Sequence, residues 1–301
     1  MTWAAAALAG AALAAFINII DKRIIVGYAR TPKTQPLAIG LTMPFVGAVL
    51  LAASGIPDSA GVEPVVWALV SGMCYGLGAQ ILLFVLYTQE VSRAVPVFQT
   101  YPIFTAVIAF LFLGERLDPA AWLAILAVVA GAALLSMRFG AHGGRGLPLW
   151  ALLLLVAGSA VEGSSYVFGK SAVEELPVLA THALRMFALG GVLLAFNLRR
   201  RPLADLRLFV RRRSPALAYI ALNQFVVANL GLLMFVWALS LGPTALVTAL
   251  TGLRTFFLVV FTIALSLVWR GSLGERPTPG AAAVKLGAAA LIVGGAATIA
   301  L

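Results

Sequence analysis

The chain has 301 residues, of which 62% are hydrophobic and only 11% are charged. A water-soluble domain carries about 25% charged residues, so this sequence lacks the polar side chains needed to cover a water-soluble surface. A net charge of +10 would point to nucleic acid on a soluble protein, but here the basic residues lie between apolar runs. The composition therefore predicts an α-helical integral membrane protein without a nucleic-acid partner.

Ten apolar runs are long enough to be membrane helices, because about 20 apolar residues cross roughly 30 Å of hydrocarbon. The uncharged stretch 214–253 is too long for one helix, and the turn signal Leu241-Gly242-Pro243 divides it. No basic segment precedes the first run, which favours a retained helix over a cleaved signal peptide. The predicted helices are 2–21, 35–55, 64–87, 92–113, 119–137, 148–170, 178–198, 215–240, 243–269 and 280–300.

Two features of the loops and helix ends support this division. Tryptophan prefers the membrane interface, and all six tryptophans lie near predicted helix ends: Trp3, Trp67, Trp122, Trp150, Trp237 and Trp269. The loops after the odd-numbered helices hold nearly all the basic residues, whereas the opposite side holds only Arg116 and Lys170. The positive-inside rule then predicts a multi-pass protein of a prokaryotic-type cytoplasmic (inner) membrane, with both termini outside.

The basic segment Arg199–Arg213 has two interpretations. It is an orientation signal on a cytoplasmic loop, or it is a surface helix that binds anionic lipid, with each basic residue contributing about 1 kcal/mol.

The two halves of the chain resemble each other. At a constant offset Phe84 matches Phe235 and Thr100 matches Thr251, and the tetrapeptide Leu113–Arg116 returns at residues 273–276. Because each half has five predicted helices, the second half enters the membrane from the opposite side. Inverted repeats of this kind are typical of transporters, with the substrate site between the halves near the midplane. We predict an N-terminal repeat at 1–137, a glycine-rich cytoplasmic linker at 138–147 and a C-terminal repeat at 148–301.

These features carry a family resemblance. The ten spans, the two repeats, and the segments Ser92–Pro96 and Phe112–Leu117 resemble the drug/metabolite transporter superfamily, in its branch of ten-helix EamA-type permeases. The resemblance covers essentially the whole chain. It implies transport of amino acids, nucleotide sugars, other metabolites or lipid-linked groups by alternating access. The second repeat departs from the family pattern in its longer ninth helix and in Arg270 before the tetrapeptide.

Ionisable residues inside the spans are the main site candidates. A charge at the centre of a membrane helix costs about 2.5–3.5 kcal/mol, so each should face a partner or a wet cavity. Arg254 lies near the midplane, either to bind an anionic group or to pair with Glu162. Arg185 and His182 share one helix face, either on the cavity wall or near the outer surface. Glu162 is alternatively a proton carrier, and Lys285 reaches either the headgroups or the cavity.

Neutral polar residues complete the predicted substrate site, although each has the alternative role of bonding a neighbouring helix. These residues are Asn18, Gln80, Gln99, Tyr101, Tyr166, Asn229 and Thr251. By contrast, the helices at 119–137 and 280–300 are rich in alanine and glycine. Small residues permit close packing, so these two helices are either peripheral supports or the seam of a homodimer.

No motif indicates an enzyme or a cofactor. The single cysteine, Cys74, excludes an intramolecular disulfide and a cysteine-based metal site. Glu162 is the only acidic residue well inside a span, whereas a hydrolase needs paired carboxylates or a nucleophile with its base. We predict no catalytic residue, no metal and no cofactor.

The sequence predicts a secondary-active transporter that moves a small metabolite with an anionic group through a central cavity between the repeats. One alternative is a flippase for a lipid or a lipid-linked anionic group. Another is a non-transporting membrane subunit or a membrane-embedded enzyme. The expected partners are a small-molecule or lipid-headgroup substrate, membrane lipids and, in a coupled mechanism, protons.

Overall fold

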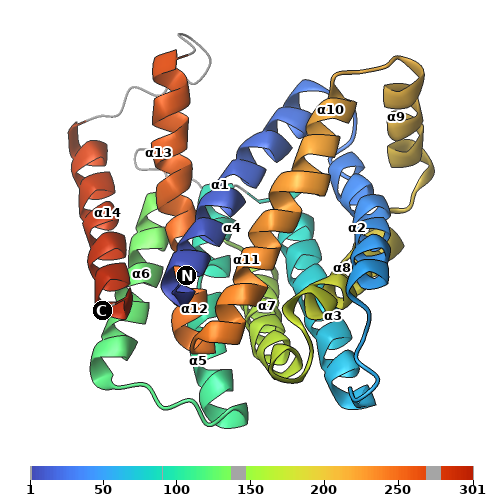
Figure 1. Ribbon diagram of the computed structural model, residues 1–301. Coiled ribbons are helices and arrows are strands. Elements are labelled where there is room, and N and C mark those ends of the chain that lie inside the picture. Colours follow the sequence, from blue (N-terminus) through green and yellow to red (C-terminus); the bar gives the residue numbers. More distant parts are fainter. Residues whose placement is uncertain (1, 90, 137–146, 269–278, 301) are drawn as a thin grey trace.

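The computed structural model describes residues 2–89, 91–136, 147–268 and 279–300. Every regular element in these ranges is helical, as the composition predicts (Figure 1). The first half contains α1 Trp3–Gly27, α2 Thr34–Ser54, α3 Val62–Leu86, α4 Val91–Phe98, α5 Tyr101–Phe112 and α6 Pro119–Ser136. The second half contains α7 Leu149–Glu175, α8 Val178–Asn197, α9 Arg200–Arg211, α10 Ala216–Ala221, the π-helix η1 Leu222–Val227, α11 Ala228–Leu241, α12 Thr244–Thr251, α13 Leu253–Val268 and α14 Pro279–Ala300.

All ten predicted spans are helical along most of their length. Within the described residues, eight segments are long and apolar enough to cross a membrane, and two shorter apolar helices span Pro119–Leu135 and Gly287–Ile299. The structure is therefore that of an all-α, multi-pass membrane protein.

Two of the predicted continuous helices are broken instead. The run at 92–113 divides into α4 and α5 around Gln99 and Thr100, and the run at 243–269 divides into α12 and α13 at Gly252. Pro102 accounts for the first break, because it lacks the backbone N–H that would continue the helix and it is accepted in the first turn of α5. The breaks occupy matching positions in the two halves, since Thr100 and Thr251 are related by the sequence offset. At both breaks the backbone forms a turn, with hydrogen bonds from Thr100 N–H to Val97 and from Gly252 N–H to Ala249. Backbone groups freed by such an interruption at membrane depth must be buried by protein or line a wet cavity.

The helices also pack in matching pairs. By their order in each half, α1 corresponds to α7, α3 to α11 and α5 to α13. Both α3 and α5 contact α7, and their counterparts α11 and α13 both contact α1. Small residues permit the closest approaches. A Cβ added to Gly72 of α3 would lie 2.3 Å from the carbonyl oxygen of Arg185 in α8. This close contact fixes the backbone that presents the Arg185 side chain.

The alanine- and glycine-rich helices α6 and α14 pack against each other at one side of the bundle (Figure 1). A Cβ on Gly131 would lie 2.7 Å from the carbonyl oxygen of Ala288, and one on Gly295 would lie 2.8 Å from that of Ala124. Part of the small-residue surface is thus used within the chain, as expected for supporting helices. Gly287 and Gly294 face away, with no described atom within 4 Å of an added Cβ.

The segment Arg199–Arg213 forms the amphipathic helix α9, which lies beside α2 at one end of the bundle (Figure 1). Asp205 attaches this helix to the start of α2. Its Oδ2 accepts hydrogen bonds from the backbone N–H of Arg30 (2.8 Å) and Thr31 (3.2 Å) and from the Thr34 hydroxyl (2.8 Å). The seven arginines of the segment are all exposed. The start of α1 lies beside α12, away from α9 (Figure 1).

Candidate functional site

The central cluster consists of buried and half-buried polar, charged and aromatic side chains where the broken helices meet α3, α7 and α8. We define it by seven predicted site residues and by Tyr75, which lies among them. These residues are Gln99, Tyr101, Glu162, Tyr166, Arg185, Thr251, Arg254 and Tyr75.

Arg254 is the second residue of α13, just after the break at Gly252, and it is hydrogen-bonded to Gln99 at the other break. Its Nη2 donates a hydrogen bond to Gln99 Oε1 (3.1 Å), and Gln99 Nε2 donates to the Thr255 hydroxyl (2.9 Å). Gln99 is 3% exposed. The amide therefore orients the guanidinium group and links the two halves at their breaks.

Arg185 of α8 is 3% exposed and is hydrogen-bonded to Ser165 of α7, which is in turn hydrogen-bonded to α3. Its Nη2 donates to the Ser165 hydroxyl (3.3 Å), and the Ser71 hydroxyl donates to the backbone oxygen of Ser165 (2.5 Å). The Nε of Arg185 is buried and has no hydrogen-bond partner within the described ranges. A buried cation with an unused donor is a candidate for anion recognition, because orphaned buried polar groups are rare in folded proteins.

Glu162 of α7 lies near both arginines but pairs with neither. The side chain is 5% exposed, its Oε2 has no hydrogen-bond partner, and no ion pair within 4.0 Å joins it to Arg185 or Arg254 among the described residues. The charges of both arginines nevertheless act on it. The predicted Arg254–Glu162 ion pair is therefore not formed in this structure.

Gly78 provides the space for this carboxylate. A Cβ added there would lie 2.6 Å from Glu162 Oε2, well inside van der Waals contact.

Three tyrosines form one wall of the central cluster. Tyr101 stacks on Tyr166 with ring centroids 5.8 Å apart, and Tyr75 meets Tyr166 edge-on at 6.4 Å. The Tyr101 hydroxyl is hydrogen-bonded to the Thr251 hydroxyl across the two breaks. The wall thus joins residues of α3, α5, α7 and α12 around the arginines.

The remaining predicted site residues have other surroundings. Gln80 accepts a hydrogen bond from Asn197 (2.7 Å), which joins α3 to α8. His182 Nε2 is within hydrogen-bond distance of Asn229 Oδ1 (3.3 Å), and the amide of Asn229 donates to the backbone oxygen of Gln224. Asn18 is exposed. The side chain of Lys285 lies outside the described residues.

Sequence reasoning missed a contact made by the first repeated tetrapeptide. Glu115 accepts hydrogen bonds from the backbone N–H groups of Thr244 (2.7 Å) and Ala245 (3.2 Å) at the start of α12. A carboxylate at a helix N-terminus satisfies free N–H groups and complements the helix dipole. The sequence indicated that the tetrapeptide lies in a loop, but it gave no signal that Glu115 contacts the start of α12 in the other half.

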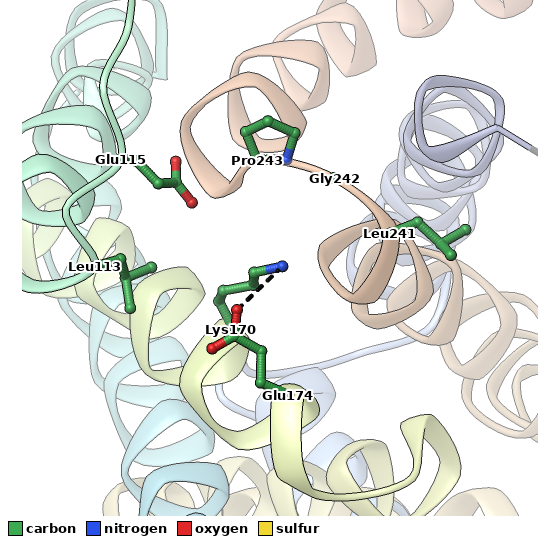
Figure 2. Close-up of a pocket in the computed structure, with 7 residues that line it drawn as sticks. All are labelled: Leu113, Glu115, Lys170, Glu174, Leu241, Gly242 and Pro243. Carbon is green, nitrogen blue, oxygen red and sulfur yellow. Dashed lines mark ion pairs between the residues drawn. The ribbon is translucent and has the colours of Figure 1, made fainter.

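A cavity of about 340 Å³ adjoins this contact (Figure 2). Lys170 points into it from α7, pairs with Glu174 (3.4 Å) and donates to the backbone oxygen of Leu239 at the end of α11 (2.9 Å). Its wall also includes the turn Leu241-Gly242-Pro243 that joins α11 to α12. Charged side chains of α7 and of the α5–α6 loop therefore hold both ends of the α11–α12 connection.

Sequence reasoning also missed a second polar cluster. Asp21, placed at the end of the first predicted helix, lies inside α1 and accepts hydrogen bonds from Gln35 and Asn223.

No group of three metal-ligating His, Cys, Asp or Glu side chains occurs among the described residues.

The helical bundle, its broken helices and the buried charges between them define a multi-pass membrane transporter. The chain matches the description "EamA-like transporter family" over residues 1–137 and 149–300. It therefore belongs to the EamA-like transporter family, within the drug/metabolite transporter superfamily that the sequence resembles.

Solved structures agree with this fold. A protein of known crystal structure is 20% identical, with a TM-score of 0.70, covering 98% of this chain and 95% of its own, and 28 solved chains match in all. At this identity the likeness concerns the fold alone. No curated protein matches the chain.

Proposed function

We propose that this permease carries a small molecule with an anionic group, which binds between Arg185 and Arg254 in the middle of the bundle. The observation that carries the proposal is a pair of guanidinium groups, one buried and one half-buried, that form no ion pair with a carboxylate of the described residues. A guanidinium group has five N–H donors, and each arginine makes a single hydrogen bond to the described residues. A carboxylate or phosphate group matches such donors in charge and geometry.

Glu162 has a regulatory part in this proposal. Its charge acts on the same two arginines, so it competes with an anionic substrate for them. Protonation of Glu162 would remove the competing charge, and proton movement would thereby be coupled to substrate binding.

We further propose that transport proceeds by alternating access between two inverted repeats of five spans each, which gives ten crossings. The matching helix breaks and the matching packing partners support this arrangement. Discontinuous helices at the repeat interface are a recurrent device for binding substrate near the midplane. The contact of Glu115 with α12 closes one end of the pathway, at the face opposite α9.

The orientation follows from charge. The exposed arginines of α9 and the basic α1–α2 loop lie at the cytoplasmic face, so Glu115 and both chain ends face outside.

The test is a ligand screen followed by transport. Purified protein is heated in the presence of carboxylates, phosphomonoesters, neutral sugars and organic cations, and we expect stabilisation by one or more anions. A ligand at a hundred times its Kd stabilises a protein by about 2.7 kcal/mol. Arg254→Gln should abolish this stabilisation, and Arg211→Gln on the surface of α9 is the matched control. Stabilisation by cations or neutral sugars alone, or an unchanged anion response in Arg254→Gln, overturns the proposal.

A further inference from the structure

The second polar cluster joins three helices at the end of the bundle that carries α9. Asp21 of α1, Gln35 of α2 and Asn223 of η1 meet at one point. The Oδ1 of Asp21 accepts hydrogen bonds from Gln35 Nε2 and from Asn223 Nδ2, both at 2.6 Å. α1, α10 and α2 lie together in this part of the structure (Figure 1).

Both amides of this cluster are incompletely bonded. Gln35 is 2% exposed and Asn223 is fully buried, yet Gln35 Oε1 and Asn223 Oδ1 have no hydrogen-bond partner in the part of the chain that the structure describes. Each of these oxygens is bonded to the same carbon as the nitrogen that contacts Asp21, so each lies beside the carboxylate. Two orphaned amide oxygens next to one carboxylate require an explanation, because buried polar atoms are rarely left unpaired.

The two oxygens are available to a bound ligand if the amides rotate. A half-turn about the terminal torsion of either side chain exchanges the NH₂ group for the oxygen at little cost in volume. After both turns, the amide oxygens point to the place where the two nitrogens now meet Asp21. Three oxygens would then converge there, which is repulsive unless a cation lies between them.

We propose that Asp21, Gln35 and Asn223 form a binding site for a sodium ion. Carboxylate and amide oxygens are the ligands that hard cations prefer. A single carboxylate balances a single positive charge, and the nearby basic residues Lys22 and Arg23 of α1, both exposed, disfavour a divalent ion. In the ion-free state the amide N–H groups neutralise Asp21, and in the bound state the sodium ion takes their place.

Two further features fit this site. Asn223 belongs to η1, where the backbone of the span is wound as a π-helix, and such segments occur frequently at functional sites. Asp21 is itself partly exposed, which leaves the ion a route from solution. The site rests on its own geometry and does not depend on the proposed substrate.

The experiment is a thermal titration of the purified, full-length protein in sodium-free buffer. Sodium chloride replaces choline chloride at constant ionic strength, without any substrate. We expect a saturable rise in Tm of several degrees with sodium and none with choline. The rise should be absent in Asp21→Asn, whereas Glu174→Gln, which alters an exposed carboxylate, should respond as the natural protein does.

A second variant keeps the test decisive if Asp21→Asn does not fold. Gln35→Met preserves the length of the side chain and removes one oxygen, so the sodium concentration at half-effect should rise about tenfold or more. The proposal is overturned if the natural protein shows no sodium-specific rise, if the rise persists in Asp21→Asn, or if Gln35→Met leaves the midpoint unchanged. Stabilisation by acid in place of sodium also overturns it, in favour of a protonated Asp21. Failure here leaves the anion site untouched, because the two measurements use different ions and different residues.

Discussion

Asp21 and Glu162 are two carboxylates inside membrane helices, and they differ in what surrounds them. Asp21 accepts two short hydrogen bonds from side-chain amides. Glu162 is less exposed, and its Oε2 has no hydrogen-bond partner among the described residues. The charges of two arginines act on it, although neither forms an ion pair with it there. The first carboxylate ties helices together in the ion-free state, whereas the second leaves charges uncompensated. Replacing Asp21, which is hydrogen-bonded, should therefore lower the stability of the protein. Replacing the arginines near Glu162 should instead weaken ligand binding.

The largest expected effect concerns the uncompensated arginines. Replacing both, in Arg185→Gln with Arg254→Gln, should reduce exchange of the screened anion in proteoliposomes by more than about 100-fold. Loss of one buried charged partner costs about 2–5 kcal/mol in binding. The thermal stability of the double variant should fall little, because each arginine makes one hydrogen bond to the described residues. The paired surface change Arg207→Gln with Arg211→Gln serves as the control, and near-normal exchange by the core variant would refute the assignment.

The next effect separates the two carboxylates by stability. Asp21→Leu should destabilise the protein by about 2–4 kcal/mol, since it leaves two buried amides without an acceptor. Glu162→Gln, which keeps the volume of the side chain and removes no hydrogen bond within the described residues, should cost about 1 kcal/mol or less. Unfolding in denaturant or by heat measures both changes. Equal losses in the two variants would show that the contrast between these carboxylates is false.

A smaller effect is expected at the outer contact. Glu115→Ala removes the acceptor of two N–H groups at the start of α12 and should cost about 1–2 kcal/mol. Glu115→Asp tests whether the length of the side chain matters, and Glu175→Ala, at an exposed residue of α7, provides the control. If the contact closes the outer end of the pathway, a cysteine reagent added outside should label a cysteine placed at Thr248 faster in the alanine variant. Equal labelling rates would contradict the closing role.

The smallest effect is expected at Gln80. Its hydrogen bond with Asn197 links α3 to α8 away from the arginines. Such bonds between membrane helices average about 0.6 kcal/mol. Gln80→Leu should therefore lower stability by less than about 1 kcal/mol and leave anion binding unchanged, as measured by the same thermal titration. A tenfold loss of anion affinity in this variant would place Gln80 in the substrate site.

Sequence reasoning found the membrane class and most of the central cluster for a physical reason. Charges such as Arg254, Arg185 and Glu162 are costly in a membrane helix, so their presence identifies a protected interior. The same argument failed for Asp21, because a charge at the end of an apolar run is indistinguishable from a loop charge. Periodicity also gave no signal for the breaks at Gln99 and Gly252, because each break is a single turn within an apolar run. Partners far apart in sequence, such as Glu115 and Thr244, became visible only with the packed helices.

The central claim is that Arg254 binds the substrate anion while Glu162 competes with it. The most direct test is the affinity of the purified protein for the screened anion, compared with the Arg254→Gln and Glu162→Gln variants in one titration series. We expect opposite changes: affinity falls by about 30-fold or more in Arg254→Gln, and it stays constant or rises in Glu162→Gln. A fall of similar size in both variants would contradict the claim, because it would make Glu162 a partner of the substrate and not its competitor.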